Sequence, residues 1–350
     1  MKFLSLFLPL FFGWFSTPLS AQEQLKVAAI GFYNFENLFD TIDQPEVNDV
    51  EFTPAGDYHY NTNIYQDKLS RLAQVVSEMA TDITPDGLSL LGVAEIENRG
   101  VLEDFAAQPA VAARNYQIAH FDSPDRRGID VALLYQAKYF KLEQARPLRL
   151  DNLFYSEGDS VFTRDILWVK GRYDDETIHV FVAHWPSRRG GEAASAHLRN
   201  AAALRFKLTA DSIQLADPSA KIILMGDLND DPTSPSVAKV IQAQGDVAKV
   251  ATMGYYNPML PLFRKGLGTT AYRDNWSLFD QIILNKQWLG TETSGWRFHQ
   301  AFIFNPSYLF QKSGRFRGYP QRAFVGSSYV QGYSDHFPVY ILLVKPVVRP

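Results

Sequence analysis

Residues 221–229 read Lys-Ile-Ile-Leu-Met-Gly-Asp-Leu-Asn, and this stretch indicates how the chain folds. The apolar run Lys221–Met225 is typical of a buried strand. Asp227 and Asn229 follow directly at positions i and i+2, so both side chains lie on one side if the chain stays extended. Polar groups at strand ends often assemble a site in sheet proteins, whereas a turn closed by Asp231-Pro232 is the plainer interpretation.

The same pattern recurs along the chain. Further apolar runs predict strands, and two stretches with helical spacing of apolar residues predict helices. Strands and helices alternate throughout, which predicts an α/β or α+β class and one domain from Leu25 to the C-terminus. The polar segment 40–63 is expected to be a long loop. The predicted strands are Leu25–Tyr33, Leu88–Ala94, Ile129–Tyr135, Asp165–Gly171, Ile178–Ala183, Lys221–Met225, Gln281–Leu284 and Val339–Val344, and the predicted helices are Ile64–Met79 and Glu192–Leu215.

Composition narrows the possible classes of protein. Of 350 residues, 46% are hydrophobic and 21% are charged, which is typical of a globular protein. The net charge of -4 and the lack of a long Lys/Arg run give no support to tight non-specific binding of nucleic acid, although a local groove can still be basic. Cysteine is absent, so the fold depends on its core and on any bound ions rather than on disulfides.

The N-terminus has the residue order of a secretory signal peptide. Lys2 precedes an apolar run that ends at Phe15, and the small residues Ser20 and Ala21 follow. We therefore expect a signal peptide over residues 1–21, cleavage after Ala21, and an exported protein that is periplasmic or extracellular. The run is shorter than the roughly 20 residues of a membrane span, and an uncleaved anchor is the alternative.

Other predicted strands also end in residues that can bind metal or move protons. Asn34 follows the first strand, Glu95 the second, and His184 the run Ile178–Ala183. Asp280 precedes a strand, and Asp335-His336 precedes the last one. Taken singly, each has an ordinary interpretation: a turn-forming Asn, a paired carboxylate, or a hydrogen-bonded histidine.

Taken in order, these motifs resemble the endonuclease/exonuclease/phosphatase superfamily across about Leu25 to Val344. The most specific pieces are Gly226–Asn229 and Tyr333–Pro338, and Arg127–Tyr135 is similar to the Arg/Gly-led central strand of that superfamily. The chain looks most like a secreted bacterial branch. The resemblance implies an α/β (α+β) four-layer sandwich, in which two packed mixed β-sheets are flanked by helices. It also implies a divalent-metal-dependent hydrolase of phosphoric esters, most simply a secreted endonuclease.

The resemblance also assigns roles to individual residues. Asn34, Glu95 and Asp335 are the expected ligands of Mg²⁺ (or Mn²⁺), with Glu36 as a weaker candidate, because hard cations prefer oxygen ligands. Asp227 is expected to orient or deprotonate the attacking water, with Asn229 holding Asp227 or a phosphate oxygen. The remaining expected site residues are His336, oriented by Asp280, and His184, all near the phosphate, and Arg127, Arg188 and Arg189 as phosphate contacts.

The substrate is less well defined by the sequence. Trp185 and Trp276 could stack on a base or sugar, although most tryptophans serve the core. The apolar segment Gly254–Phe263 could form a lipid-binding lip or could belong to the core. A nuclease is therefore weighed against a phosphodiesterase or phosphatase for lipid head groups or inositol phosphates, and against a non-catalytic surface protein. The expected partner is a phosphodiester substrate, with nucleic acid as one candidate, bound by a monomer with no membrane span.

Overall fold

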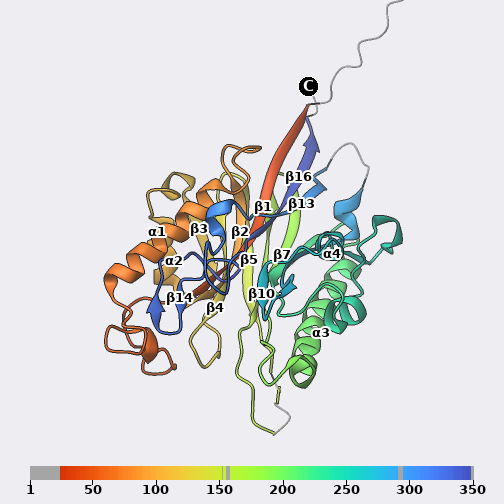
Figure 1. Cartoon of the computed structure of the whole chain (residues 1–350). Helices are drawn as coiled ribbons and strands as arrows, with labels where there is room; N and C mark the ends of the chain where they lie inside the picture. The colour runs from red at the N-terminus through yellow and green to blue at the C-terminus, as the bar shows by residue number, and fades with distance from the viewer. Residues whose placement is uncertain (1–23, 152, 155–157, 291–294, 348–350) are drawn as a thin grey trace, which may run out of the picture.

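Two mixed β-sheets of six strands each form the centre of the molecule, as the computed structural model shows (Figure 1). The structure describes residues 24–151, 153–154, 158–290 and 295–347. The first sheet has the strand order β13 (Arg297–Ile303), β16 (Val339–Pro346), β1 (Leu25–Leu38), β2 (Leu88–Ile96), β4 (Asp130–Gln136) and β3 (Tyr116–His120). The second has the order β5 (Phe140–Leu148), β6 (Ile166–Tyr173), β7 (Glu176–His184), β8 (Lys221–Asp227), β12 (Asp280–Asn285) and β9 (Tyr255–Tyr256).

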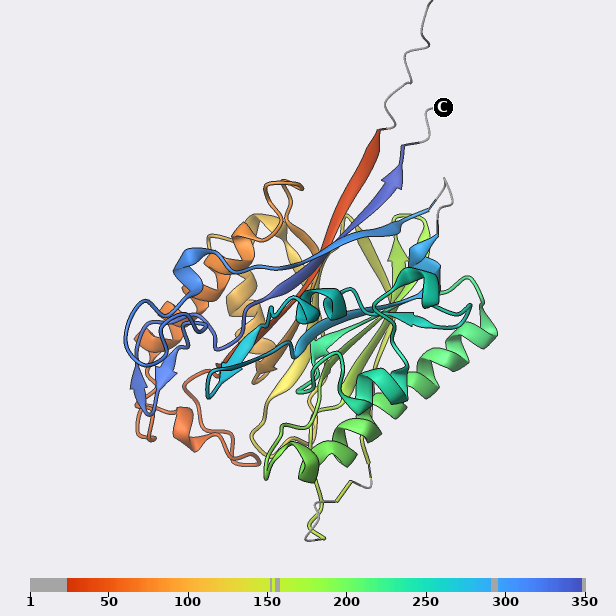
Figure 2. The ribbon, with the colours of Figure 1, turned by 45° about the vertical axis from the view of Figure 1, so that its right-hand side comes forward.

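Helices cover the outer faces of both sheets. Figures 1 and 2 show α1 (Thr62–Glu78) and α2 (Arg99–Ala106) on one side, and α3 (Glu192–Ala216) on the other. The side chain of Asn61 caps α1 by accepting the amide hydrogens of Asn63 and Ile64, which accounts for where that helix begins. The smaller elements are α4 (Met259–Arg264), the hairpins β10 (Thr270–Tyr272)–β11 (Asn275–Ser277) and β14 (Phe324–Val325)–β15 (Ser328–Tyr329), a π-helix (Ser236–Ile241), and 3₁₀ turns at Val50–Phe52, Ala112–Arg114, Val247–Lys249, Lys286–Leu289 and Ser307–Leu309.

Three hydrophobic clusters fill the spaces between these layers. One joins α1 and α2 to the first sheet, with Leu72 and Phe105 against Val93. A second lies between the sheets. The third joins α3 to the second sheet, where the rings of Phe206 and Phe181 meet edge to face at 5.0 Å. The predicted four-layer sandwich is therefore confirmed, and the unbroken apolar runs of the central strands follow from burial on both faces.

Each predicted strand and helix is present, and several extend further than expected. β1 continues through Asn34 to Leu38, and β8 includes Asp227. Segment 40–63 is mostly irregular, as expected, with a short 3₁₀ turn. Among the elements that the sequence analysis missed are β5 and β13, which lie at sheet edges and are partly exposed. Their side chains do not form the continuous apolar runs on which the strand predictions rested.

Two glycines allow β8 to pack closely against β7 and against the first sheet. A Cβ atom on Gly226 would lie 2.0 Å from the carbonyl oxygen of Ala183, on the neighbouring strand. A Cβ atom on Gly92 would lie 2.5 Å from the Sδ of Met225, where the two sheets meet. Glycine is therefore required at position 226, where a Cβ atom would meet the backbone of β7, whereas at position 92 the flexible Met225 side chain would have to move.

No helix within the described ranges is both long and apolar enough to cross a membrane. The predicted signal peptide over residues 1–21 lies outside the described residues.

His179 on β7 gives a prediction for stability. Its Nδ1 accepts a hydrogen bond from the indole N–H of Trp168 at 3.2 Å, and the residue is 6% exposed. Burial lowers the pKa of His179 to about 4, and nearby Lys170 adds to the effect. Because the folded state resists protonation, the unfolded state binds the additional proton. The free energy of unfolding should therefore fall as the pH drops from about 6.5 towards 4, by at most about 3 kcal/mol from this residue.

His179→Asn tests this contribution, because its Oδ1 can still accept the Trp168 hydrogen bond but does not titrate. Urea unfolding at pH 7 and at pH 4 should show a smaller loss of stability for the variant than for the wild type. Identical losses in the two proteins would rule out this role for His179.

Candidate active site

The second sheet brings together His184, Asp227 and Asp280, because β7 and β8 end where β12 begins. β7 and β8 run parallel, and His184 pairs with Asp227 at their ends. β12 runs antiparallel to β8, so its first residue, Asp280, pairs with Asp227 from the other side. All three residues are buried. The register therefore places three of the predicted site residues in one row.

The first sheet contributes Asn34 and Glu95 from neighbouring parallel strands. Asn34 pairs with Ala94, and Glu95 is the next residue of β2. The register of β2 against β4 shifts between Ala94 and Ile96, and Glu95 has a φ of 59°. Such a bulge changes the direction of a side chain at a strand end. Glu95 Oε1 lies 3.7 Å from Nε2 of His184, so the ends of the two sheets meet in one site.

Asp227 is held by two asparagines. The Asn34 side chain donates to its Oδ2 at 3.1 Å, and the Asn229 backbone amide donates to its Oδ1 at 2.9 Å. The Asn229 side chain instead donates to the carbonyl of Trp185 at 3.0 Å. Burial raises the pKa of Asp227 to about 7, with His336 acting in the opposite direction. A carboxylate of this kind can exchange a proton with water near neutral pH.

His336 and Asp280 form a close pair. His336 Nδ1 lies 2.7 Å from Asp280 Oδ2, and its Nε2 lies 3.8 Å from Asp227 Oδ2. Burial disfavours a charged imidazole, but the carboxylates of Asp280 and Asp227 outweigh it and hold the pKa of His336 well above its ordinary value. The Ser334 hydroxyl accepts the His336 amide hydrogen and donates to the Asn34 carbonyl, which anchors this segment to β1.

His184 differs from His336 in charge. Its Nε2 lies 3.5 Å from Asp227 Oδ2, and its Nδ1 has no hydrogen-bond partner within the described part of the chain. Burial lowers the pKa of His184 well below its ordinary value, and the cations Arg164 and Arg127 add to this effect. The two histidines therefore take opposite protonation states at neutral pH, which gives the site one neutral and one cationic imidazole.

Asp335 and Glu36 meet at Arg322. Arg322 lies 2.7 Å from Asp335 Oδ2 and 3.9 Å from Glu36 Oε1. Burial would raise the pKa of Asp335, but His336 and Arg322 outweigh it and hold that pKa below its ordinary value. Burial raises the pKa of Glu36 to about 8, and Asp335 adds to the rise. The buried Lys68 donates to the carbonyl of Asn37 at 3.0 Å and so ties α1 to this corner.

The donor set of the site fits a hard divalent cation. Glu95 Oε2 accepts the Asn37 amide hydrogen at 3.0 Å, while Oε1 faces His184. Asp227, Asp280 and His336 offer ligand atoms within 4.8 Å of one another, one of two such groups among the described residues. The second group is His120, Asp122 and Asp130. The Asp280–His336 hydrogen bond accounts for part of the first group, and Glu95 adds an oxygen donor of the kind a hard cation prefers at the same corner. The ligand set of Asn34, Glu95 and Asp335 stays a prediction, since Asp335 is paired with Arg322 here.

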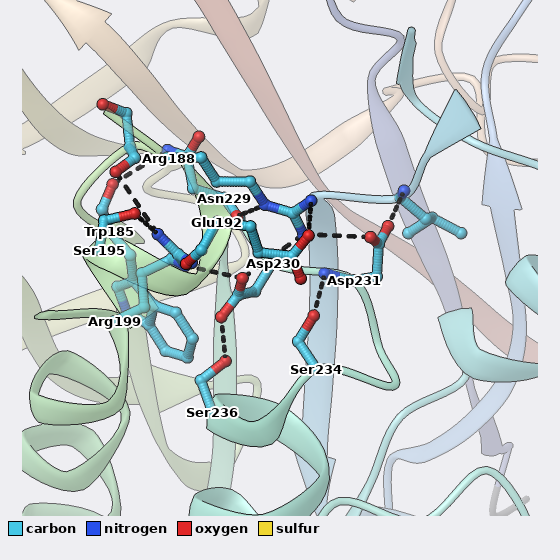
Figure 3. Close-up of polar contacts among 12 residues, drawn as sticks. Trp185, Arg188, Glu192, Ser195, Arg199, Asn229, Asp230, Asp231, Ser234 and Ser236 are labelled. Carbon is cyan, nitrogen blue, oxygen red and sulfur yellow. Dashed lines mark hydrogen bonds and ion pairs between the residues drawn. The ribbon is translucent and has the colours of Figure 1, made fainter. Parts of the chain in front are cut away.

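Arg188 lies in a structural network (Figure 3). Its guanidinium donates to the Asn229 carbonyl at 2.9 Å, to Asp231 at 3.1 Å and to Glu192 at 3.0 Å. The same group lies 4.6 Å from the centre of the Phe279 ring. These contacts indicate that Arg188 positions the loop after β8, which differs from the phosphate contact predicted for it.

The loop after β8 has a second, fully buried anchor. Arg199 of α3 pairs with Asp230 Oδ1 at 2.7 Å, and the Ser236 hydroxyl donates to Asp230 Oδ2 at 2.7 Å (Figure 3). Burying a carboxylate without such partners costs free energy of folding. This network therefore stabilises the loop that carries Asn229.

Arg127 and Arg189 line a cavity of about 290 Å³, together with Arg126, Arg164 and the segment Pro186–Ser187 that follows His184 and Trp185. Arg164, which the sequence analysis missed, is 5% exposed and donates to the carbonyl of Trp185 at 2.7 Å and to Asp125 at 2.8 Å. Its only sequence signal was an arginine at the start of an apolar strand. Arginines gathered at a cavity suit phosphate oxygens, but Arg127 also lies 3.5 Å from the buried Asp125 of the same lining, and the phosphate contacts of Arg127 and Arg189 stay predictions.

The remaining aromatic candidates belong largely to the core. Trp185 is fully buried. Trp276 stacks on Phe337 at 6.0 Å and is partly buried against the first cluster. Within Gly254–Phe263, Tyr255 and Met259 are buried, so of the two interpretations of this segment the structure supports the core and not a lipid-binding lip.

Comparison with known proteins places the chain in a family. The sequence model of the endonuclease/exonuclease/phosphatase family matches residues 29–345, and the chain belongs to that family. Its members are phosphoester hydrolases that use divalent metal ions. No curated protein matches the sequence.

Solved structures agree on the fold. An endonuclease/exonuclease/phosphatase family protein from Bacteroides thetaiotaomicron is 15% identical, with a TM-score of 0.53 over 93% of this chain and 98% of its own. TDP2 from D. rerio in complex with a single-strand DNA product is 13% identical, with a TM-score of 0.51 over 91% and 98%. A mannosyl-6-phosphatase from Bacteroides thetaiotaomicron VPI-5482 is 15% identical, with a TM-score of 0.52 over 90% and 99%.

The His336–Asp280 pair predicts non-additive losses. His336→Ala should lower kcat/KM by roughly 10²- to 10⁴-fold, the range of a lost proton-handling or phosphate-binding group. Asp280→Asn should be milder, since it keeps the ring but removes the carboxylate that charges it. The double variant should be little worse than His336→Ala, because residues that act as a unit are not additive. Steady-state kinetics with circular dichroism checks this, and multiplying losses would show that the two residues act separately.

Proposed function

We propose that this protein is a divalent-metal-dependent phosphodiesterase that cleaves nucleic acid, most simply as an endonuclease. The observation that supports this best is the convergence of Glu95 from β2, Asp227 from β8 and His336 from the segment before β16 onto one corner, with His184 between Glu95 and Asp227. A scaffold that only bound a partner would gain nothing from burying carboxylates and histidines together, because such burial is costly.

The residues divide the work of hydrolysis among them. Asp227, fixed by Asn34 and Asn229, accepts a proton from the attacking water. His336, held cationic by Asp280, donates to a phosphate oxygen and offsets the charge that develops there. His184 faces the same phosphate as a neutral donor. Glu95, with Asn34 and Asp335, would hold a divalent metal ion, and that ion would supply Lewis acidity toward the phosphate.

The arginine-lined cavity favours a substrate with more than one phosphate. Arg126, Arg127, Arg164 and Arg189 border the cavity next to the segment that follows His184, which suits a neighbouring phosphate of a strand. The buried segment Gly254–Phe263 leaves the lipid-directed alternative without the lip it requires. Phosphatase activity on inositol phosphates or another phosphate monoester is the second candidate, because one protein of similar structure is named a mannosyl-6-phosphatase.

A substrate panel tests the proposal. Plasmid DNA, single-stranded DNA, RNA, sphingomyelin, inositol phosphates and bis-p-nitrophenyl phosphate are each incubated with the protein and Mg²⁺ or Mn²⁺. We expect cleavage of a nucleic acid and of the model diester. Turnover of monoesters alone would replace the nuclease with a phosphatase, and no turnover together with no metal binding by calorimetry would leave only a binding protein.

We also propose that the enzyme is exported and acts as a monomer. The basis for export is the residue order at the N-terminus, and the expected mature chain begins at Gln22. Mass analysis of the protein from its native host decides this, and an intact Met1 in the soluble fraction would contradict it.

A further inference from the structure

A cavity of about 310 Å³ adjoins the active site at Asp335 and has no role in the mechanism above. Two exposed aromatic side chains line it, Tyr272 at 72% and Phe316 at 44% exposure. Three arginines line it as well: Arg273, Arg315 and Arg322. Single exposed aromatics are ordinary on protein surfaces, but two of them beside three guanidinium groups at the edge of an active site form a distinct chemical surface.

The two walls of the cavity are tied together. The Tyr319 hydroxyl donates to Asp274 Oδ1 at 2.6 Å, and the Asp274 amide lies 2.6 Å from the same hydroxyl. Within the wall that carries Phe316, the Gln311 amide donates to the Tyr319 carbonyl at 2.7 Å. The turn between β10 and β11 is thereby joined to the segment around Phe316, so the two aromatic walls are held at a fixed separation.

A continuous set of contacts joins this cavity to the reacting groups. Trp276 of β11 lies 6.0 Å from Tyr319 and stacks on Phe337, the residue after His336. The Phe337 amide donates to the Thr269 carbonyl at 2.7 Å, and Thr269 Oγ1 accepts the Asp280 amide hydrogen at 3.3 Å. A group bound in the cavity is thus placed close to His336, which donates to the phosphate in the proposed mechanism.

Charge and ring geometry identify what the cavity can hold. Of the lining carboxylates, Asp335 is paired with Arg322, and Asp274 is engaged by Tyr319. Arg273 lies over the Tyr272 ring at 5.1 Å, and Arg315 over the Phe316 ring at 5.7 Å. Flat aromatic faces accept a planar ring by stacking, and nearby guanidinium groups favour a ring attached to an anion. A nucleotide combines both features.

We propose that this cavity is a base-binding subsite, in which Tyr272 and Phe316 stack a nucleobase next to the scissile phosphate of a single-stranded nucleic acid. The inference rests on the proposed function and makes it more specific, since a base paired within a duplex does not offer its faces for stacking on protein side chains. Tyr272 and Phe316 are specificity-determining residues here and take no part in the chemistry.

The test compares a fluorescently labelled single-stranded oligodeoxynucleotide with an abasic strand of the same length and charge. Binding is measured by fluorescence anisotropy and cleavage by kcat/KM, for the wild type, Tyr272→Ala and Phe316→Ala. The matched control is Phe154→Ala, a half-exposed phenylalanine that does not line this cavity. Stacking on an aromatic side chain contributes roughly a 5- to 100-fold change per base.

We expect the wild type to prefer the base-containing strand, and each cavity variant to lose about 5- to 100-fold on that strand only. The abasic strand should be treated alike by all four proteins, and Phe154→Ala should resemble the wild type on both strands. Equal affinity of the wild type for the two strands, or losses that are the same on both, would overturn the subsite. Absence of cleavage would count against the proposed function alone, because the anisotropy comparison still decides the subsite.

Discussion

Replacing Asp227 with Asn is expected to lower kcat/KM by roughly 10²- to 10⁴-fold while the protein stays folded. The change keeps the shape of the side chain, and its single oxygen can still accept the Asn229 amide hydrogen, although the hydrogen bond from the Asn34 side chain to the other oxygen is lost. What is lost is the proton acceptor in the middle of the cluster. His184 and His336 lie 3.5 and 3.8 Å from Asp227 Oδ2, which places this carboxylate between the two imidazoles.

Asp211→Asn is the matched control for this change. Asp211 lies on α3 and accepts a hydrogen bond from the Tyr255 hydroxyl at 2.7 Å, remote in the fold from the cluster. Its variant should lose a little stability and keep its kcat. Circular dichroism and steady-state kinetics on the diester that is turned over measure both effects. A folded Asp227→Asn enzyme with nearly full activity would remove the proposed route for the water.

Replacing Glu95 with Gln should weaken metal binding and lower kcat/KM by about 10³-fold, equivalent to several kcal/mol of lost Lewis-acid assistance. Gln keeps an oxygen for the Asn37 amide but removes the negative charge that a hard cation needs. EDTA should abolish the activity of the wild type reversibly, and Mg²⁺ or Mn²⁺ should restore it. Calorimetry of the metal alone provides a reading that does not depend on turnover.

Glu97→Gln is the matched control for Glu95→Gln, because Glu97 lies directly after the end of the same strand. Glu97 is buried, accepts hydrogen bonds from the Asp40 amide and the Gln44 side chain, and faces away from the cluster network described above. Burial raises the pKa of Glu97 to about 8, so it is largely neutral at neutral pH and Gln is a close substitute. Its metal affinity should match the wild type. Full activity of the wild-type enzyme in EDTA would exclude the metal-dependent mechanism.

Sequence reasoning worked where the signal is local. The apolar run Lys221–Met225 followed by Asp227 identified both a central strand and a polar strand end, because a strand buried on both faces shows itself as continuous hydrophobicity. β5 was missed because its exposed positions and Pro147 interrupt that signal at the sheet edge. Strand order and register were also beyond reach, since they depend on pairing between distant segments.

The candidate site shows the same division. Asp280 and His336 were predicted as a pair from their motifs, and they lie 2.7 Å apart. Arg188 was expected to contact phosphate because it follows His184 closely. Its partners Asp230 and Asp231 lie more than forty residues further along the chain, and nothing in the sequence around Arg188 indicates that they bind its guanidinium. Arg164 was missed for a similar reason, because its position beside Trp185 arises only from the fold.

The left-handed backbone conformation of Glu95 lowers the stability of the fold at a residue that is proposed to bind the metal ion. A φ of 59° costs a glutamate of the order of 1–3 kcal/mol, whereas asparagine tolerates this conformation better. Selection for thermal stability alone would therefore tend to replace Glu95, and in the proposed mechanism the more stable protein would lack its metal ligand. A protein that keeps glutamate at this position therefore has a lower free energy of unfolding than it could have. Substitutions meant to raise its thermal stability belong in the helices and outer loops, and the bulge at Glu95 should be left unchanged.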